Sequence, residues 1–312
     1  MSFDDGLMIG MMLGGGGGSG GGDEWTFPEH WPDIPDPEPN QVIMYIEAED
    51  GDVAPIIGLY GQNYGGGTID YGDDGTYNYP EGRAYNVYHV YQTAGQYIIT
   101  INAPDGEVEI SYNSTNVKFM DGSITEGNYG GYTSGKCQCL KAIKIGGNIS
   151  LNNAAGGYGG STAIGSYYQN CLIYIEYMGA VNDKNNPIFS NFPFLKKIKI
   201  GIPPDSFGDG AFSGDSALEI ADCLKNCTSI TKNMFATCVS LRRVDMINAT
   251  SQAGMAFGYC FNLRIVNAPN LTQLASGDFY YCYSLQKLIL AEGCDYNGNT
   301  FAYSPQLYPK TQ

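Results

Sequence analysis

The hydrophobic pattern of the C-terminal half repeats at a fixed interval. Phenylalanine recurs with constant spacing at positions 235, 257, 279 and 301. A cysteine or serine follows at the third position after each phenylalanine, and a leucine follows at the sixth. Such a period is typical of a solenoid, in which each coil buries its apolar face against the next coil. The predicted repeat core consists of Phe235, Cys238, Leu241, Phe257, Cys260, Leu263, Phe279, Cys282 and Leu285.

Looser copies of the same unit precede these four. Phe212 and Phe189 continue the series backwards at slightly longer intervals, and Cys137-Gln-Cys-Leu140 begins a first copy. We therefore assign residues 113–312 to one solenoid. In each coil, Leu-x-x-Val-x-apolar predicts a short strand with alternate positions facing inward and outward.

This unit resembles the BspA-like leucine-rich repeat. The resemblance rests on the Phe-x-x-Cys-x-x-Leu-x-x-Val/Leu pattern, which extends over most of the segment 113–312. It implies a right-handed solenoid with parallel strands and a role in binding rather than in catalysis.

The pattern of residues 42–112 predicts a separate β-domain, because strand-like runs are bounded by Gly, Asp and Pro. The segment from Ile69 to Thr76, followed by His89-Val-Tyr91, resembles the turn and strand of the PKD-type immunoglobulin-like β-sandwich. The predicted fold class is therefore mostly β, with a small PKD-like β-sandwich followed by a leucine-rich-repeat solenoid that has a repeat of about 22 residues.

The acidic turn of this domain allows two interpretations. Asp70, Asp73 and Asp74 can hydrogen-bond backbone amides, and Gly72 and Gly75 permit left-handed backbone. The first interpretation is a rigid turn. The second is a Ca²⁺ site formed by the three carboxylates, since Ca²⁺ prefers oxygen ligands. Ca²⁺ is the one cofactor that the sequence leaves open.

Two short segments precede the β-domain. Residues 1–22 join an apolar patch to a glycine run, and we expect this patch to anchor the chain to a partner through Leu7, Met8, Ile9, Met11, Met12 and Leu13. Residues 23–41 are acidic and contain five prolines, which favours an extended linker. Both tryptophans, Trp25 and Trp31, lie in this linker, and we expect their rings to pack against a neighbouring surface.

The net charge of −16 is unevenly distributed. Residues 1–135 carry 21 acidic and 2 basic residues, whereas residues 136–312 carry 11 acidic and 14 basic residues. The acidic half repels phosphate backbones, so no nucleic-acid partner is expected. No apolar run is long enough to span a bilayer, and no basic, apolar leader of the secretory type begins the sequence.

The nine cysteines do not favour a metal site. Cys238, Cys260 and Cys282 follow the repeat, and both histidines lie outside the solenoid, which favours a ladder of buried free thiols. Disulfides between coils and a metal site are the alternatives. No catalytic constellation or phosphate-binding loop is found, so we do not expect an enzyme.

An acidic-turn β-domain ahead of such repeats resembles surface and phage proteins of gut Firmicutes. We therefore expect a structural and adhesive protein of a phage virion, as a head or tail fibre or decoration. Residues 1–22 would dock on other virion proteins, and the solenoid would bind a host-surface glycan or protein. A bacterial cell-surface or secreted adhesin is the alternative, and a homo-oligomer is compatible with either. The expected contacts lie on the exposed solenoid face: Lys197, Lys199, Arg242, Asp245, Asn267, Tyr280, Tyr281 and Tyr283.

Overall fold

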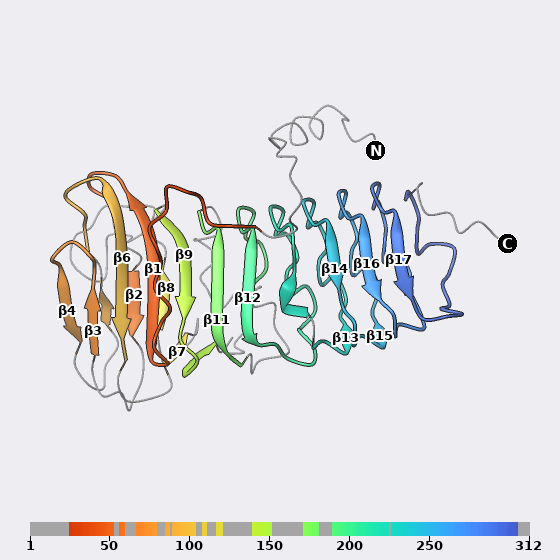
Figure 1. Cartoon of the computed structure of the whole chain (residues 1–312), viewed down its shortest axis with the longest axis horizontal. Helices are drawn as coiled ribbons and strands as arrows, with labels where there is room; N and C mark the ends of the chain where they lie inside the picture. Colours follow the sequence, from red (N-terminus) through yellow and green to blue (C-terminus); the bar gives the residue numbers. More distant parts are fainter. Residues whose placement is uncertain are drawn as a thin grey trace.

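Short strands stacked along one long axis make up almost all of the regular structure in this computed structural model (Figure 1). The structure describes residues 25–52, 56–59, 67–79, 85–87, 89–103, 108–110, 117–120, 139–151, 171–180, 189–224 and 226–304. The strands are β1 (Gln41–Ala48), β2 (Ile56–Leu59), β3 (Gly67–Asp70), β4 (Thr76–Tyr79), β5 (Tyr85–Val87), β6 (Gly95–Asn102), β7 (Val108–Ile110), β8 (Val117–Met120), β9 (Leu140–Ile145), β10 (Ile149–Leu151), β11 (Tyr174–Ala180), β12 (Lys197–Ile202), β13 (Ser229–Ile230), β14 (Arg243–Asp245), β15 (Ser251–Gln252), β16 (Ile265–Ala268) and β17 (Lys287–Leu290), with a short 3₁₀ helix, η3 (Asp222–Leu224).

One sheet connects the N-terminal β region to the solenoid. Its strand order is β12-β11-β9-β1-β6-β3-β4, so β1 lies between β6 of the N-terminal region and β9 of the first coil. β1 pairs antiparallel with both neighbours, whereas β9, β11 and β12 are parallel. The repeat pattern begins after the boundary expected between residues 112 and 113. The sheet, however, contains strands from both sides of that boundary. Because β1 pairs with β9, the first coil has no open strand edge on that side.

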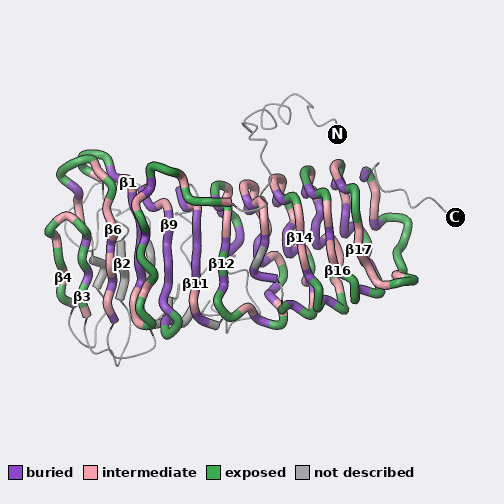
Figure 2. Tube along the Cα trace, viewed as in Figure 1, coloured by how far each residue is buried: buried purple, intermediate pink, exposed green. Residues whose placement is uncertain are grey.

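The parallel sheet continues to the C-terminal coils. Single bridges join Lys197 to Ile220 and Ile220 to Arg243, and β14, β16 and β17 then pair in parallel. Three small sheets complete the strand pairing of the described residues, in the orders β5-β2-β8, β10-β7 and β13-β15. Residues facing the interior of the coils are buried, and the exposed residues lie on the turns and on the outer face (Figure 2).

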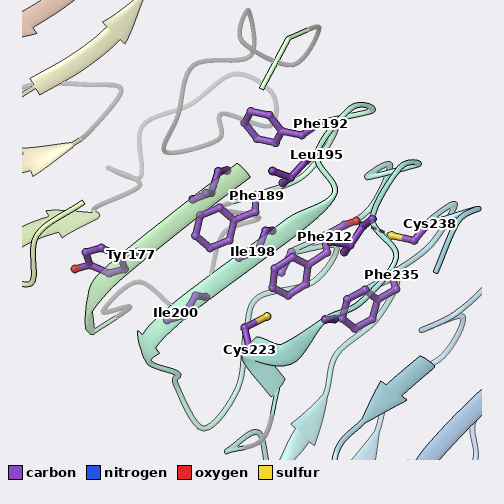
Figure 3. Close-up of a cluster of buried hydrophobic side chains, with 14 of the residues drawn as sticks. Tyr177, Phe189, Phe192, Leu195, Ile198, Ile200, Phe212, Cys223, Phe235 and Cys238 are labelled. Carbon is purple, nitrogen blue, oxygen red and sulfur yellow. Dashed lines mark hydrogen bonds between the residues drawn. The ribbon is translucent and has the colours of Figure 1, made fainter. Parts of the chain in front are cut away.

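The predicted phenylalanines form one continuous column inside the solenoid. The rings of Phe189, Phe212 and Phe235 stack in sequence, as Figure 3 shows. The column continues to Phe301 with ring centroids 5.4–5.7 Å apart and interplanar angles of 6° or less. The fold class predicted from the repeat period is thus confirmed, as a mostly β solenoid. Each added ring buries apolar area that a single coil could not bury.

A second column runs beside the first and is built from cysteine. Cys238, Cys260 and Cys282 are fully buried free thiols. Each thiol donates a hydrogen bond to the carbonyl of a phenylalanine in an adjacent coil, at 3.0–3.1 Å. Ser304 occupies the same position one coil later and donates to the carbonyl of Phe279. The repeated cysteine therefore combines the size of a small apolar group with one weak donor.

Residues 25–40, which we call the strap, pack against the outer face of the sheet rather than extending away from it. Trp31 and Ile34 are buried against β1, β9 and β11. Trp25 stacks on Tyr174 of β11, with ring centroids 5.9 Å apart. At the other end, a Cβ added at Gly146 would lie 2.2 Å from the carbonyl oxygen of Glu38, so only glycine permits this approach.

The phenylalanine column gives a direct stability prediction. Replacing Phe257 with alanine removes a fully buried ring from between two others, and we expect the free energy of unfolding to fall by about 3–5 kcal/mol. Phe194 is 53% exposed, so Phe194→Ala should change the free energy of unfolding by less than about 0.5 kcal/mol. Urea unfolding followed by circular dichroism measures the free energy of unfolding of both variants. Equal destabilisation by the two substitutions would contradict a stabilising role of the phenylalanine column.

Candidate binding surface

Two rows of basic side chains run along the outer face of the solenoid. The rows occupy the seventh and eighth positions after the repeating phenylalanine. Strand pairing places the eighth positions in register from coil to coil, through Lys197, Ile220, Arg243, Ile265 and Lys287. We call the basic members of the two rows the basic stripe: Lys196, Lys197, Arg242, Arg243, Arg264 and Lys287.

Acidic neighbours balance only part of the stripe. Glu219 lies 3.4 Å from Arg242, and Asp245 accepts two hydrogen bonds from Arg243 at 2.6 and 3.0 Å. Asn267 also donates to Asp245, at 2.9 Å. Among the described residues, no carboxylate lies within ion-pair distance of three further cations, which are all exposed: Lys196, Arg264 and Lys287. The stripe therefore keeps an excess of positive charge on a chain of net charge −16.

An aromatic edge borders the stripe on the last three coils. Tyr259, Tyr281 and Tyr303 stack in a column, with ring centroids 5.3 and 4.7 Å apart. Tyr280 packs edge-on against all three rings, at 4.5–5.5 Å. Tyr283 stacks with Phe261 and is 41% exposed. The edge therefore presents ring edges and phenol hydroxyls to solvent.

The stacked tyrosines hold an unfavourable backbone conformation. Tyr259, Tyr281 and Tyr303 have φ of 63°, 57° and 60°, in the left-handed region that costs a non-glycine residue about 1 kcal/mol or more. Gly214 occupies the equivalent position in an earlier coil. Ring stacking between coils offsets part of this cost, which links the tyrosines to the solenoid register.

A buried ionic cluster lies where the strap crosses the sheet. Lys144 of β9 donates to Asp36 and to the carbonyl of Ile34, both at 2.7 Å. Glu176 of β11 accepts a hydrogen bond from Tyr174 at 2.8 Å and pairs with Lys199. The hydrogen bond from Lys144 lowers the pKa of Asp36, and that from Lys199 to Glu176 raises the pKa of Lys199. Lys199, expected as an exposed contact, therefore already has a partner.

The acidic turn is built as a hydrogen-bonded loop. Asp70 accepts from the amide of Gly72 at 2.8 Å, and Asp73 accepts from the amide of Gly75 at 3.1 Å. The second oxygen of Asp73 lies 2.7 Å from His89. Gly72 and Asp74 have left-handed backbone, whereas Gly75, which could also adopt it, does not. In the described part of the chain, no group of three His, Cys, Asp or Glu side chains is placed to hold a metal ion.

Two carboxyl groups lie inside the solenoid. Burial raises the pKa of Asp215 well above its usual value, and it raises that of Asp278 to about 7. Asp215 takes the cysteine position of its coil and accepts one hydrogen bond, from the amide of Phe192 at 2.8 Å. Both side chains are fully buried, so neither carboxyl group is accessible to solvent.

Only part of this surface was expected from the sequence. The expected contacts on this face and its bordering edge are Lys197, Arg242, Asp245, Asn267, Tyr280, Tyr281 and Tyr283. Arg264, Lys287 and Tyr303 were not expected, although the repeat register applied from Phe189 onward aligns them. The anchor residues of segment 1–22 lie outside the described residues. No helix in the described part of the chain has the length and apolarity to cross a membrane.

The buried aspartate at 278 predicts a pH-dependent stability. Its pKa is about 7 in the folded chain and near 3.8 when unfolded, so folding favours the protonated form. This contribution is complete below pH 4 and is lost as the pH rises to about 7, at up to about 1.4 kcal/mol per pH unit. Asp278→Asn should therefore gain stability relative to the wild type over this range, whereas exposed Asp295→Asn should follow the wild type. Urea unfolding from pH 4 to 8 measures the free energy of unfolding of each variant. If this free energy depends on pH in the same way for the wild type and D278N, the prediction is refuted.

Comparison with known proteins identifies the repeat. Residues 160–260 and 248–308 match the family described as the BspA type leucine rich repeat region, in six copies. The match does not reach residues 42–112, so the resemblance to the PKD-type domain stays a prediction.

No curated protein matches the chain. Among solved structures, a leucine rich cell surface protein from Faecalibacterium prausnitzii A2-165 is 25% identical, with a TM-score of 0.30, and the match covers 38% of this chain and 32% of that one. The match thus spans about a third of that protein's length. Residues 160–308 of this chain are therefore similar to the BspA type leucine rich repeat region, which agrees with the repeat geometry.

Proposed function

We propose that this protein is a non-enzymatic adhesive protein whose solenoid binds a glycan or protein on a host surface. The observation that carries the proposal is the basic stripe, in which strand pairing aligns the coils and leaves Lys196, Arg242, Arg264 and Lys287 exposed on one face. Backbone hydrogen bonds and the phenylalanine column hold these coils together. Such a surface binds without first ordering itself, which lowers the entropic cost of association.

Two observations favour binding over catalysis. The carboxyl groups with raised pKa values, Asp215 and Asp278, are enclosed in the core. His89, in the N-terminal sheet region, is engaged with Asp73 and stacks on Tyr71. These groups are enclosed in the core or engaged by neighbouring side chains, whereas Arg264 and Lys287 are exposed on the solenoid face.

Adhesion can be measured with the full chain, because β1 belongs to the same sheet as the first coil. Fluorescent beads coated with the protein are incubated with cells of gut Firmicutes and with a cultured intestinal epithelium. We expect retention on one of these surfaces to exceed that of albumin-coated beads severalfold. Retention equal to that of albumin on both surfaces would refute the adhesive role.

We further propose that the chain is displayed on a phage virion through residues 1–22. The supporting feature is the apolar segment 7–13 followed by a glycine run, which suits insertion between other subunits. Immunogold labelling and density-gradient sedimentation of particles should then place the chain on virions, and deletion of residues 1–22 should release it. Labelling of bacterial envelopes instead of particles would favour the bacterial surface adhesin.

A further inference from the structure

The second column of the core, which we call the cysteine column, follows one hydrogen-bonding rule from coil to coil. The hydroxyl of Ser304 accepts a hydrogen bond from the amide of Cys282 at 2.8 Å and donates one to the carbonyl of Phe279. The thiol of Cys282 likewise accepts from the amide of Cys260 and donates to the carbonyl of Phe257 at 3.1 Å. Each of these side chains therefore joins an amide and a carbonyl of the preceding coil.

Asp215 is the member of the cysteine column one coil before Cys238, and its side chain is fully buried. Its Oδ1 accepts from the amide of Phe192 in the preceding coil at 2.8 Å, as the rule requires. Its Oδ2 is buried, and no donor among the described residues reaches it. The second partner that the rule assigns to Asp215 is the carbonyl of Phe189, which can only accept. An ionised carboxylate would thus set two acceptors against each other inside the core, which costs free energy.

The surroundings of Asp215 offer no charge that would balance an ionised carboxylate. No Lys, Arg or His side chain in the described part of the chain forms an ion pair with it, and no metal-binding group of side chains is found there. From the preceding coil it meets the backbone amide of Phe192, and from the next coil the thiol of Cys238. Burial raises the pKa of this thiol well above its usual value, so the thiol is neutral.

We propose that Asp215 is protonated at neutral pH, donates a hydrogen bond from Oδ2 to the carbonyl of Phe189, and loosens the junction between these two coils when it loses the proton at alkaline pH. The pKa of Asp215, which burial raises well above its usual value, agrees with this protonation. The proposal concerns the packing of the coils and does not depend on which ligand the solenoid binds.

The junction that Asp215 spans also has little strand pairing. A single bridge, from Lys197 to Ile220, joins the strands of its two coils, whereas β11 and β12 pair over most of their length. The rings of Phe189 and Phe212 are 6.0 Å apart, against 5.1–5.7 Å for the later pairs of the phenylalanine column (Figure 3). One side-chain hydrogen bond is therefore a larger share of the coupling between coils here than further along.

Infrared spectroscopy detects the proton directly. Difference spectra of the full chain at neutral pH compare the wild type with Asp215→Asn. We expect the wild type to show the carbonyl stretch of a protonated carboxyl group that the variant lacks, and the control Asp278→Asn to keep this band. If the difference spectrum contains no band of a protonated carboxyl group, Asp215 is ionised and the proposal is overturned.

The pH dependence of stability gives a second test, because Asp215→Asn supplies a permanent donor of the same size. In the unfolded chain the carboxyl ionises at its usual pKa, so the wild type should lose stability relative to the variant as the pH rises. The ratio of their unfolding constants should grow by up to about tenfold per pH unit above about pH 4, and level off once the folded carboxyl ionises. Urea unfolding at a series of pH values measures this ratio, and Asp295→Asn, at an exposed position, should follow the wild type. A ratio that does not change with pH would contradict the proposal.

Hydrogen exchange at matched alkaline pH locates the effect. Peptides that contain Phe192 should exchange at least about threefold faster in the wild type than in Asp215→Asn, whereas peptides that contain Phe279 should exchange alike. Equal acceleration along the whole solenoid would show that the junction is not the place affected. Asp215→Cys, which copies the next coils, is the second neutral variant and should behave as Asp215→Asn does in all three measurements.

Discussion

Every coil of this solenoid depends on its neighbours, because no coil is large enough to bury its own apolar side chains. The stacked rings from Phe189 to Phe301 and the cysteine thiols bonded to phenylalanine carbonyls fix where each coil lies on the previous one. Peptide groups between coils are paired as well, as from Phe257 to Asp278. Once this stacking is set, the outward positions must form straight rows. The basic stripe and the aromatic edge are therefore consequences of the packing inside.

The same dependence explains how much could be predicted from the sequence. The spacing of Phe235, Phe257 and Phe279 was sufficient for the solenoid, because the interactions are repeated and link equivalent positions. The contact of Trp31 with Tyr45 and the pairing of β1 with β9 were not predictable in this way. Each is a single long-range contact without a periodic signal. Likewise, Asp74 rather than Gly75 takes the left-handed conformation, since hydrogen bonds of the whole turn decide it.

The binding surface lies between these two cases. The residues of the surface follow the repeat, so their alignment could be predicted once the register was extended to Phe189. Their ion-pair partners could not be predicted, because Lys199 pairs with Glu176 and Arg242 pairs with Glu219 across different coils. Residue type alone therefore overestimates how many cations are free, and the structure reduces the set to those without a close carboxylate.

The strap also determines how the protein would respond to mechanical load. A tether attached ahead of Trp25 would first pull on the aromatic cluster at Tyr174 and the Asp36–Lys144 pair. Only after these contacts break would the tension reach β1, which pairs antiparallel with both β6 and β9. Detachment under flow would thus proceed in stages and dissipate work before the coils themselves are stretched.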